Sequence, residues 1–429
     1  MHYIRGVGIL GPPLFCLLGI YRGTPLLALG DPRGDHDNAE YYASWCGNGL
    51  EYLDDSKCAK VFPSTPTRNI QCAASSDSEP PVGFAPDLPF SQIRPESLES
   101  VVTNGADACV ILTRRGKGGQ LLNKYFCTPQ GQAYETWSSS KIFAMANAGG
   151  TLRGREPADY CAAGVMGLDS VTTGKASPTL PLGDLATIVC SYDHTAGYTS
   201  NSLSSYFHDL GWRTTIHDLV QSDWLGGLSS PSVTLGGNYG EQTPSDLSYR
   251  LTSGTGTAMC DVVAKPVSSQ PTYNNSLTGL AAAELTRRLV LHADIDPALR
   301  WPFLEEEDVA SLVQGADGSS LFPSQVFGGM SADTSIFLQS WLNMSQVEAA
   351  SEGRWRIYSK LGDGYSSSRQ VGEIVYNVYA CLPGYLGGLE ATIHVRGSVS
   401  KDTGLVAAES IVHDAVGMIV EAISDGRIV

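Results

Sequence analysis

Strand-type sequence lies at both ends of the main part of this 429-residue chain, and helical sequence lies between. Ala108–Arg114 and Gln120–Cys127, joined by a glycine-rich turn, predict a β-hairpin. Three more β-type runs occur after residue 350, and a long helical pattern follows the last of them. Strands at both ends must pair into one sheet, so the helical middle of the chain is an insertion.

The other predicted elements follow from the same periodicities. Gly-rich turns separate the late strands, and the middle of the chain repeats apolar residues at helical spacing. We expect strands at Arg354–Lys360, Glu373–Leu382 and Glu390–Arg396, helices at 139–148, 182–190 and 203–210, a helix capped by Thr278, and a last helix capped by Asp402. This order predicts an α+β fold: an antiparallel sheet flanked by helices, with a large inserted all-helical subdomain at about 142–350.

The N-terminal 30 residues have the layout of an export signal. Arg5 precedes the apolar stretch Val7–Ile20, and Ala28 and Gly30 offer small residues for cleavage. The alternative is a buried or disordered N-terminal segment. We therefore expect a signal peptide at 1–30, a loop-rich, cysteine-containing extension at 31–100, and the main domain at 101–429.

Charge and cysteine content narrow the possible partners and the compartment. The chain has 28 Lys and Arg against 44 Asp and Glu, a net charge of −16, which argues against nucleic acid or an anionic membrane surface. Ten cysteines suit an exported protein with disulfides, and none forms a C-x-x-C pair, so zinc and redox motifs are not indicated. We expect a secreted or periplasmic protein without cofactor or metal, and without a membrane span once the signal is removed.

The sharpest local motif is the Ser-x-x-Lys of Ser138 and Lys141. Residues three apart share one face of a helix, so the lysine amine would lie beside the serine hydroxyl. Burial lowers a lysine pKa and lets the neutral amine act as the base that activates a serine nucleophile. On its own the motif also fits an ordinary capped helix start.

Two further motifs follow in the order found in penicillin-binding proteins and class A β-lactamases. Thr199-Ser200-Asn201 stands where those families have Ser-x-Asn, and Lys360-Leu361-Gly362 stands where they have Lys-Thr-Gly. The chain thus resembles the serine β-lactamase and penicillin-binding-protein superfamily over roughly residues 101–429, most closely the class A-like proteins.

The resemblance implies a role for each matching residue. Ser138 would be the acylated nucleophile and Lys141 its base. Asn201 would hold Lys141 and the substrate amide, and Thr199 would pass a proton to the leaving nitrogen. Lys360 would supply positive potential for a substrate carboxylate and assist proton transfer at Thr199.

The segment after Lys360 carries the remaining candidates. The resemblance places Gly362, Gly364 and Arg369 in the substrate-binding region. Leu361 departs from the usual Thr or Ser and lacks the hydroxyl that would bond a substrate carboxylate. This departure puts the substrate class in doubt more than the fold.

A second departure concerns hydrolysis of the acyl-enzyme. Class A enzymes have a glutamate that activates the deacylating water, but this sequence has no glutamate between Asp246 and Leu277. Glu241 lies just before that window without the expected neighbours, and Asp261 has a shorter side chain. We expect a serine acyl-enzyme hydrolase acting on a β-lactam, a D-amino-acid amide or a related ester, with slow deacylation. The alternative is a catalytically degenerate descendant that binds cell-wall peptide or a protein partner.

Overall fold

The structure is a computed structural model of the whole chain. It describes residues 63–65, 72, 82–129, 132–155, 164–170, 180–191, 198–226, 232–241, 247–253, 262–264, 270–316, 328–332 and 336–429. The predicted signal peptide at 1–30, most of the extension at 31–100 and Asp261 lie outside these residues. Within the described ranges, no helix is both long enough and apolar enough to cross a bilayer.

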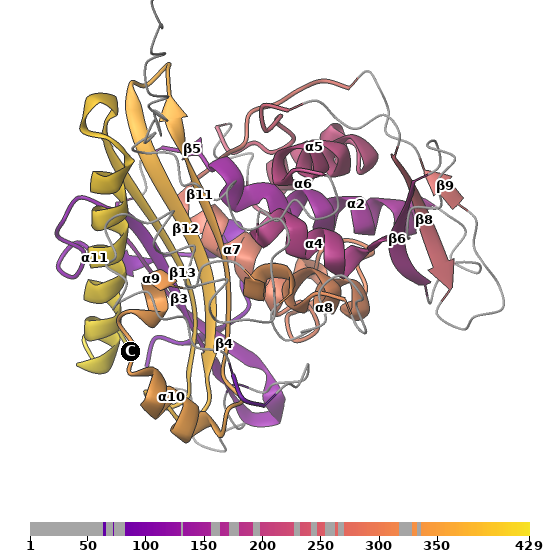
Figure 1. Cartoon of the computed structure of the whole chain (residues 1–429). Helices are drawn as coiled ribbons and strands as arrows, with labels where there is room; N and C mark the ends of the chain where they lie inside the picture. The colour runs from indigo at the N-terminus through magenta and orange to yellow at the C-terminus, as the bar shows by residue number, and fades with distance from the viewer. Residues whose placement is uncertain are drawn as a thin grey trace, which may run out of the picture.

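One seven-stranded sheet runs through the molecule and separates two helical layers (Figure 1). Its strands are β1 (Ala85–Pro86), β2 (Glu96–Ser97), β3 (Asp107–Arg115), β4 (Leu121–Cys127), β11 (Arg356–Ser366), β12 (Val371–Leu382) and β13 (Leu389–Ser400). The order is β1-β4-β3-β13-β12-β11, and β2 pairs with β4. β11 therefore forms one edge of the sheet.

The early hairpin and the late strands form one sheet, as the sequence predicts. β3 pairs antiparallel with β13, so that Cys109 lies opposite His394 and Ala108 opposite Val395. This pairing joins segments almost 290 residues apart and confirms the predicted α+β class. The late strands extend beyond their predicted ends, and β11 continues past Lys360 to Ser366.

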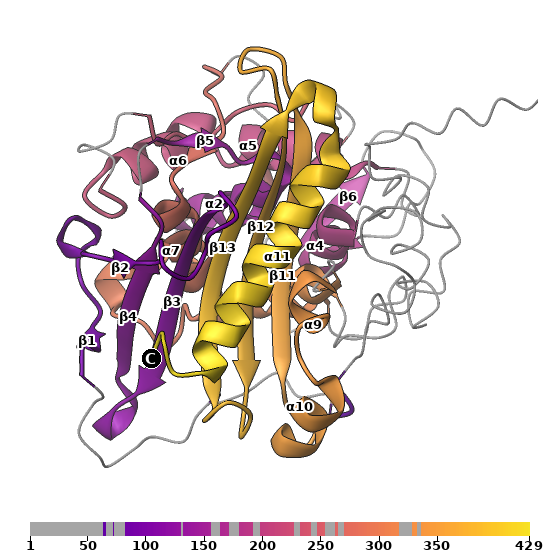
Figure 2. The same ribbon diagram turned by 90° about the vertical axis from the view of Figure 1, so that its left-hand side faces the viewer.

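Helix α11 (Leu405–Ser424) covers one face of the sheet, and Figure 2 shows it crossing in front of β12 and β13. Val412, Ala415 and Ile419 of this helix are fully buried against apolar side chains of the strands. The predicted cap at Asp402 is wrong. Residues Lys401–Thr403 form a separate 3₁₀ turn, and α11 begins after Gly404, whose φ of 87° favours glycine.

The larger helical layer covers the opposite face (Figure 1). It contains α2 (Lys141–Arg155), α4 (Leu182–Ser191), α5 (Ser200–Leu210), α6 (Arg213–Gln221), α7 (Gly279–Val290) and α8 (Glu306–Gln314). Buried side chains of these helices form one continuous apolar core. Two short helices, α9 (Ile336–Gln339) and α10 (Met344–Ser351), lead into β11.

The inserted region is not entirely helical, which corrects the expectation for residues 142–350. It holds a small antiparallel sheet in the order β7-β6-β8-β9. The strands are β6 (Gly164–Ser170), β7 (Leu180–Pro181), β8 (Leu247–Ser253) and β9 (Val262–Ala264). β8 alternates apolar and polar residues at Leu247, Tyr249 and Leu251, a two-residue period that favours a strand over a helix. A separate pair, β5 (Tyr134–Glu135) and β10 (Ser276–Leu277), lies beside α7.

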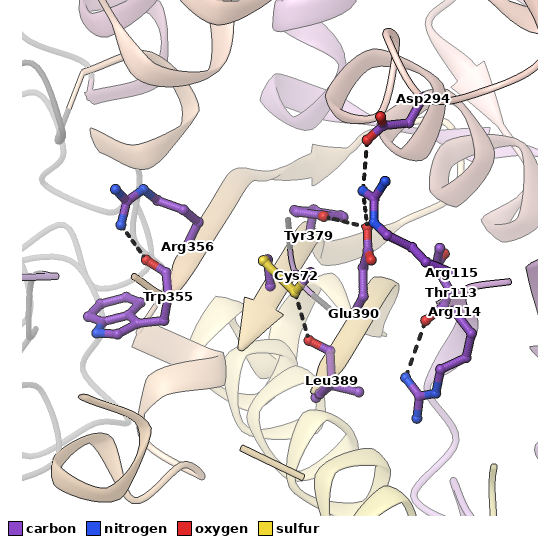
Figure 3. The surroundings of a disulfide bond; sticks show 11 residues. Cys72, Thr113, Arg114, Arg115, Asp294, Trp355, Arg356, Tyr379, Leu389 and Glu390 are labelled. Carbon is purple, nitrogen blue, oxygen red and sulfur yellow. Dashed lines mark hydrogen bonds and ion pairs between the residues drawn. A yellow bond between two sulfur atoms is a disulfide. The ribbon is translucent and has the colours of Figure 1, made fainter. Parts of the chain in front are cut away.

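The described end of the predicted extension belongs to the main sheet. β1 and β2 both pair with β4, so the sheet includes residues before 101. A disulfide also joins Cys72 to Cys381 of β12 (Figure 3). A second disulfide, between Cys109 and Cys127, links β3 to β4, and Cys190 lies buried in α4.

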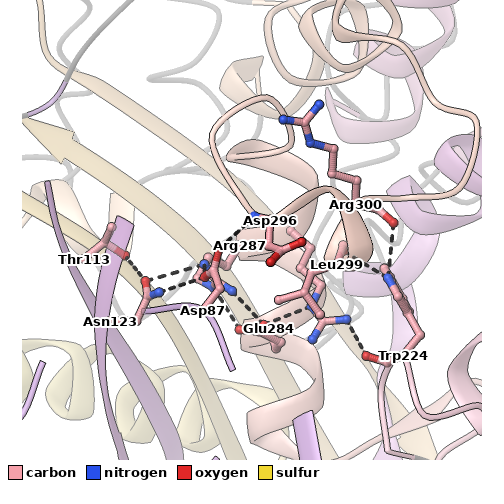
Figure 4. Close-up of polar contacts among 10 residues, drawn as sticks. Asp87, Thr113, Asn123, Trp224, Glu284, Arg287, Asp296, Leu299 and Arg300 are labelled. Carbon is pink, nitrogen blue, oxygen red and sulfur yellow. Dashed lines mark hydrogen bonds and ion pairs between the residues drawn. The ribbon is translucent and has the colours of Figure 1, made fainter. Parts of the chain in front are cut away.

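A buried ionic cluster attaches α7 to the sheet (Figure 4). The carboxylate of Glu284 accepts hydrogen bonds from Arg287 at 2.8 Å and 2.9 Å and from Arg288 at 2.9 Å. Arg287 also donates to Asp87 at 2.8 Å, and Asp87 accepts a bond from Asn123 of β4 at 2.9 Å. Each charge in the cluster thus has an opposite partner, which offsets the cost of burying it.

Candidate active site

A cavity of about 860 Å³ lies at the edge of the sheet where β11 approaches α5. Four of the predicted site residues line it: Ser138, Thr199, Asn201 and Arg369. The other four are not among the residues that line it: Lys141, Lys360, Gly362 and Gly364. Lys141 hydrogen bonds to Asn201, the two glycines lie against the turn that contains Ser138, and Lys360 interacts electrostatically with Asp363. The tertiary structure therefore gathers all eight candidates at one place.

Ser138 lies in a 3₁₀ turn, Trp137–Ser140, immediately before α2. The side chain of Ser138 is half-buried at the cavity wall, and its carbonyl accepts the N–H of Lys141. Trp137 holds a positive φ of 50°, a costly conformation for a residue with a large side chain. The indole nitrogen of Trp137 donates to the buried carboxylate of Glu373 at 3.2 Å, which anchors the turn.

Gly362 and Gly364 allow β11 to pass close to this turn. A Cβ atom at Gly362 would lie 2.5 Å from the Ser139 nitrogen and 2.7 Å from the Ser138 nitrogen. A Cβ atom at Gly364 would lie 2.4 Å from the Trp137 ring. Both positions exclude any larger residue, so their function here is close packing of strand and turn.

Lys141, the first residue of α2, is completely buried. Its Nζ donates to Asn201 Oδ1 at 2.5 Å and to Ser200 Oγ at 3.0 Å. Burial lowers the pKa of Lys141 well below its ordinary value, and the nearby charge of Lys360 lowers it further. Such a lysine can be a neutral amine at a pH where an exposed one is protonated.

Ser200 is a partner of Lys141 that the sequence analysis did not single out. The Ser200 hydroxyl donates to the Val189 carbonyl of α4 at 2.7 Å, so its oxygen is free to accept from Lys141. It occupies the middle of the Thr199-Ser200-Asn201 motif, where only the two outer positions were given roles.

Thr199 and Asn201 both contact Glu241 across the cavity. Thr199 is the N-cap of α5 and forms a reciprocal capping box with Ser202. Its hydroxyl also donates to Glu241 Oε2, and the Asn201 amide donates to Glu241 Oε1 at 3.3 Å. No local pattern indicated Glu241, because the contact joins residues about 40 positions apart.

Lys360 lies on the face of β11 that packs against the helical layer, and Leu361 lies on the other face. The Lys360 side chain is fully buried, and its Nζ donates to the Leu361 carbonyl at 3.0 Å. Leu361 is itself buried in the apolar core with α11. The leucine at this position therefore packs against the core and not toward the cavity.

Asp363, which follows Gly362 in β11, also lines the cavity, and the sequence analysis gave it no role. Burial raises the pKa of Asp363 to about 6, and the charges of Lys141 and Lys360 oppose the rise. The residue lies between Gly362 and Gly364, the two glycines that lie against the Trp137–Ser140 turn. Its adjacency to the Lys360 motif was the signal available in the sequence.

Arg369 lines the cavity but is held by acidic partners. Its guanidinium makes two hydrogen bonds of 2.5 Å to the two oxygens of Glu373. Glu135 lies 3.6 Å from the same guanidinium. Glu373 is fully buried and also accepts from Arg396 at 2.8 Å.

Two aromatic side chains support the site. The Tyr239 hydroxyl lies 3.1 Å from Ser140 Oγ, and the Tyr239 ring centroid lies 5.5 Å from the Lys141 nitrogen. Tyr134 hydrogen bonds to His394, whose other ring nitrogen lies 2.5 Å from Asn377 Oδ1. Burial lowers the pKa of His394 to about 3, so this histidine is neutral and structural near pH 7.

Comparison with known proteins gives a likeness of fold only. No protein-family model and no curated protein matches the sequence. Among solved structures, proteins from Burkholderia vietnamiensis, Streptosporangium roseum and Sphaerobacter thermophilus are similar at 13%, 13% and 14% identity, with TM-scores of 0.41, 0.38 and 0.37. The matches cover 76%, 77% and 77% of this chain and 96% of each of those chains.

All three are described as β-lactamases. This is the superfamily that the sequence resembles. Because the TM-scores are below 0.5, the assignment of function rests on the residues and geometry of this chain. Among its described residues, no three His, Cys, Asp or Glu side chains form a group that could hold a metal ion.

Proposed function

We propose that this protein is an exported serine acyl-enzyme hydrolase of the penicillin-recognising superfamily, acting on a β-lactam, a D-amino-acid amide or a related ester. One observation carries the proposal. Lys141 is fully buried, and its amine is bonded to Asn201 at 2.5 Å. It lies in the turn that follows Ser138, a half-buried residue in the wall of the cavity. A buried amine of lowered pKa, three residues after a serine at the start of a helix, suits Lys141 to act as the base that a serine nucleophile requires.

Acylation would begin with proton transfer from the Ser138 hydroxyl to the neutral amine of Lys141. The Ser138 oxygen then attacks the substrate carbonyl. Backbone N–H groups of the Trp137–Ser140 turn, called the nucleophile turn from here on, would stabilise the resulting oxyanion. Collapse of the tetrahedral species breaks the bond to the leaving group. Thr199, which lines the cavity beside Asn201, would carry the proton to the leaving nitrogen or oxygen.

Asn201 and Lys360 support this step without reacting. Asn201 orients the Lys141 amine through its side-chain oxygen. The buried charge of Lys360 helps to keep Lys141 neutral, because two adjacent ammonium groups repel each other. Lys360 thereby favours the protonation state in which Lys141 can act as a base, while Asn201 sets the position of the amine.

Deacylation is proposed to be slow. It needs a base that activates water, and the described carboxylates that line the cavity are Glu135, Glu241 and Asp363. Glu241 accepts one hydrogen bond on each oxygen, from Thr199 and from Asn201. With both oxygens already held by protein donors, this carboxylate has fewer acceptor sites left for a water molecule.

Export is supported by the two disulfides, which form and persist in oxidising compartments. A secreted or periplasmic location and a small-molecule or peptide substrate complete the proposal.

The test is intact-mass analysis after exposure to a neutral fluorophosphonate and, separately, to a penicillin. We expect one adduct per chain with the fluorophosphonate, located on Ser138 by peptide mapping. Ser138→Ala should abolish it, whereas Ser139→Ala should retain it, because the Ser139 hydroxyl is buried and bonded to the Thr136 carbonyl at 2.6 Å. An adduct that persists in Ser138→Ala would identify another nucleophile and refute the proposal.

A further inference from the structure

The cavity has few means of binding a substrate carboxylate. The family resemblance would assign that task to residues at positions 360, 361 and 369. Leu361 is apolar and buried under α11. Arg369 is engaged by both oxygens of Glu373. Lys360 donates to the Leu361 carbonyl, and its charge interacts with Asp363. Each cation near the cavity thus already has an acidic or carbonyl partner.

The charges on the cavity wall are mostly negative. Among the described residues that line it, Glu135, Glu241 and Asp363 carry carboxylates, and Arg369 carries a guanidinium. Because Arg369 is paired with Glu373, its charge is largely neutralised. A substrate in the cavity therefore faces a surplus of negative charge.

Asp363 lines the same cavity as Ser138 and interacts electrostatically with Lys141 and Lys360. The residues on either side of it, Gly362 and Gly364, approach the Ser138 nitrogen and the Trp137 ring. The positive charge of Lys360 favours the ionised form of Asp363, against the effect of burial. A group attached near the scissile carbonyl would lie within the range where an unscreened charge strongly affects affinity.

We propose that the substrate of this site is an ester or amide that carries an ammonium group near the scissile carbonyl, and that substrates with a carboxylate in that position are discriminated against. This inference rests on the proposed function, since it concerns the acyl group transferred to Ser138. The selectivity comes from Asp363, with Glu135 and Glu241 adding to it. It reverses the preference for a substrate carboxylate that the family resemblance implies.

The experiment uses three p-nitrophenyl esters of similar length: ε-aminohexanoate, heptanoate and the adipate monoester, which are cationic, neutral and anionic. The observable is the rate of the p-nitrophenol burst per active site, measured at neutral pH and moderate salt. We expect the cationic ester to acylate Ser138 about tenfold or more faster than the anionic ester, with the neutral ester between them.

Asp363→Asn should reduce the cation-to-anion ratio by several-fold. The ratio is the readout because any general loss of acylation cancels in it. Glu99→Gln is the matched control: it removes the same charge from an exposed residue that is not among those lining the cavity, and should leave the ratio unchanged. An equal effect of both substitutions would attribute the preference to the net charge of −16 and overturn the assignment to Asp363.

The two proposals fail in different ways. A Ser138-dependent burst with the neutral ester, together with equal or faster reaction of the anionic ester, would overturn the cationic preference and leave the hydrolase intact. Absence of any Ser138-dependent burst with all three esters would overturn the proposed function itself. The ratio in the unmodified protein decides the first point even if Asp363→Asn does not fold.

Discussion

The Lys141 amine donates a 2.5 Å hydrogen bond to the side-chain oxygen of Asn201, which joins the start of α2 to the start of α5. Two helices that are about 60 residues apart in the chain thereby meet at the wall of the cavity. The bond orients the amine while burial lowers its pKa, so position and protonation state are set by the same surroundings.

Lys141→Arg should reduce the rate of serine acylation by about 10²–10⁴, because a guanidinium stays protonated and cannot act as a base. In the unmodified protein the acylation rate should fall as the pH drops through the lowered pKa of Lys141, since only the neutral amine accepts a proton. Stopped-flow measurement of the burst across pH tests both points. Lys401→Arg, at an exposed site away from the cavity, is the control. Full activity of Lys141→Arg would show that another group is the base.

Gly362→Ala should disrupt acylation severely, because the added Cβ would lie 2.5 Å from the Ser139 nitrogen and push β11 away from the nucleophile turn. Gly387→Ala is the matched comparison. Its φ of 70° makes alanine strained there, by about 1 kcal/mol, but no atom lies within 4 Å of the new Cβ. Thermal unfolding would report the strain in both variants, while only Gly362→Ala should lose the fluorophosphonate adduct. Normal labelling of Gly362→Ala would contradict the close packing described here.

Neutral p-nitrophenyl esters should give a burst equal to the enzyme concentration, followed by a slow steady state. The proposed base for acylation is Lys141, whereas Glu241 is bonded to Thr199 and Asn201. Mass spectrometry during the steady state should detect the acyl-enzyme. Glu241→Gln shows whether this carboxylate contributes to deacylation, in which case the slow phase becomes slower still. Rapid turnover with no detectable adduct would mean that an efficient deacylating base exists.

Glu284→Gln should lower the free energy of unfolding by about 3–5 kcal/mol, because it leaves the buried guanidinium groups of Arg287 and Arg288 without their shared carboxylate. Denaturant unfolding measures the change. Glu352→Gln, which affects only an exposed pair with Arg354, should cost about 1 kcal/mol or less. Comparable losses in the two variants would show that the buried cluster contributes little.

The same cluster predicts a direction for acid sensitivity. Burial alone would raise the pKa of Glu284, but the charges of Arg287 and Arg288 lower it overall. A carboxyl group whose folded-state pKa is lowered contributes stability above its unfolded pKa and loses that contribution as the pH falls through the folded value. Part of the acid destabilisation of the unmodified protein should therefore be absent in Glu284→Gln.

Local patterns in the sequence predicted most elements of the fold. Thr278 caps α7, and the hairpin pairs with the late strands, as expected. The small sheet in the inserted region was not predicted, because the strand-type alternation over Leu247–Ser253 spans only 7 residues in a region whose other patterns indicate helices. Ser138 and Lys141, the predicted nucleophile and base, lie in adjacent turns because a spacing of three residues is local.

By itself, the sequence determined the features that depend on near neighbours: the Ser138–Lys141 spacing, the Thr278 cap, the glycines of β11 and the order of the hairpin, the central helices and the late strands. Only the tertiary structure decided which distant groups meet. It brings Glu241 to Thr199, Lys141 to Ser200, Cys72 to Cys381 and Asp363 to the cavity wall. The spacing of residues along the chain does not predict these contacts, because the packing of the helical layer against the sheet creates them. The charge of the cavity, and with it the proposed substrate class, depends on that packing.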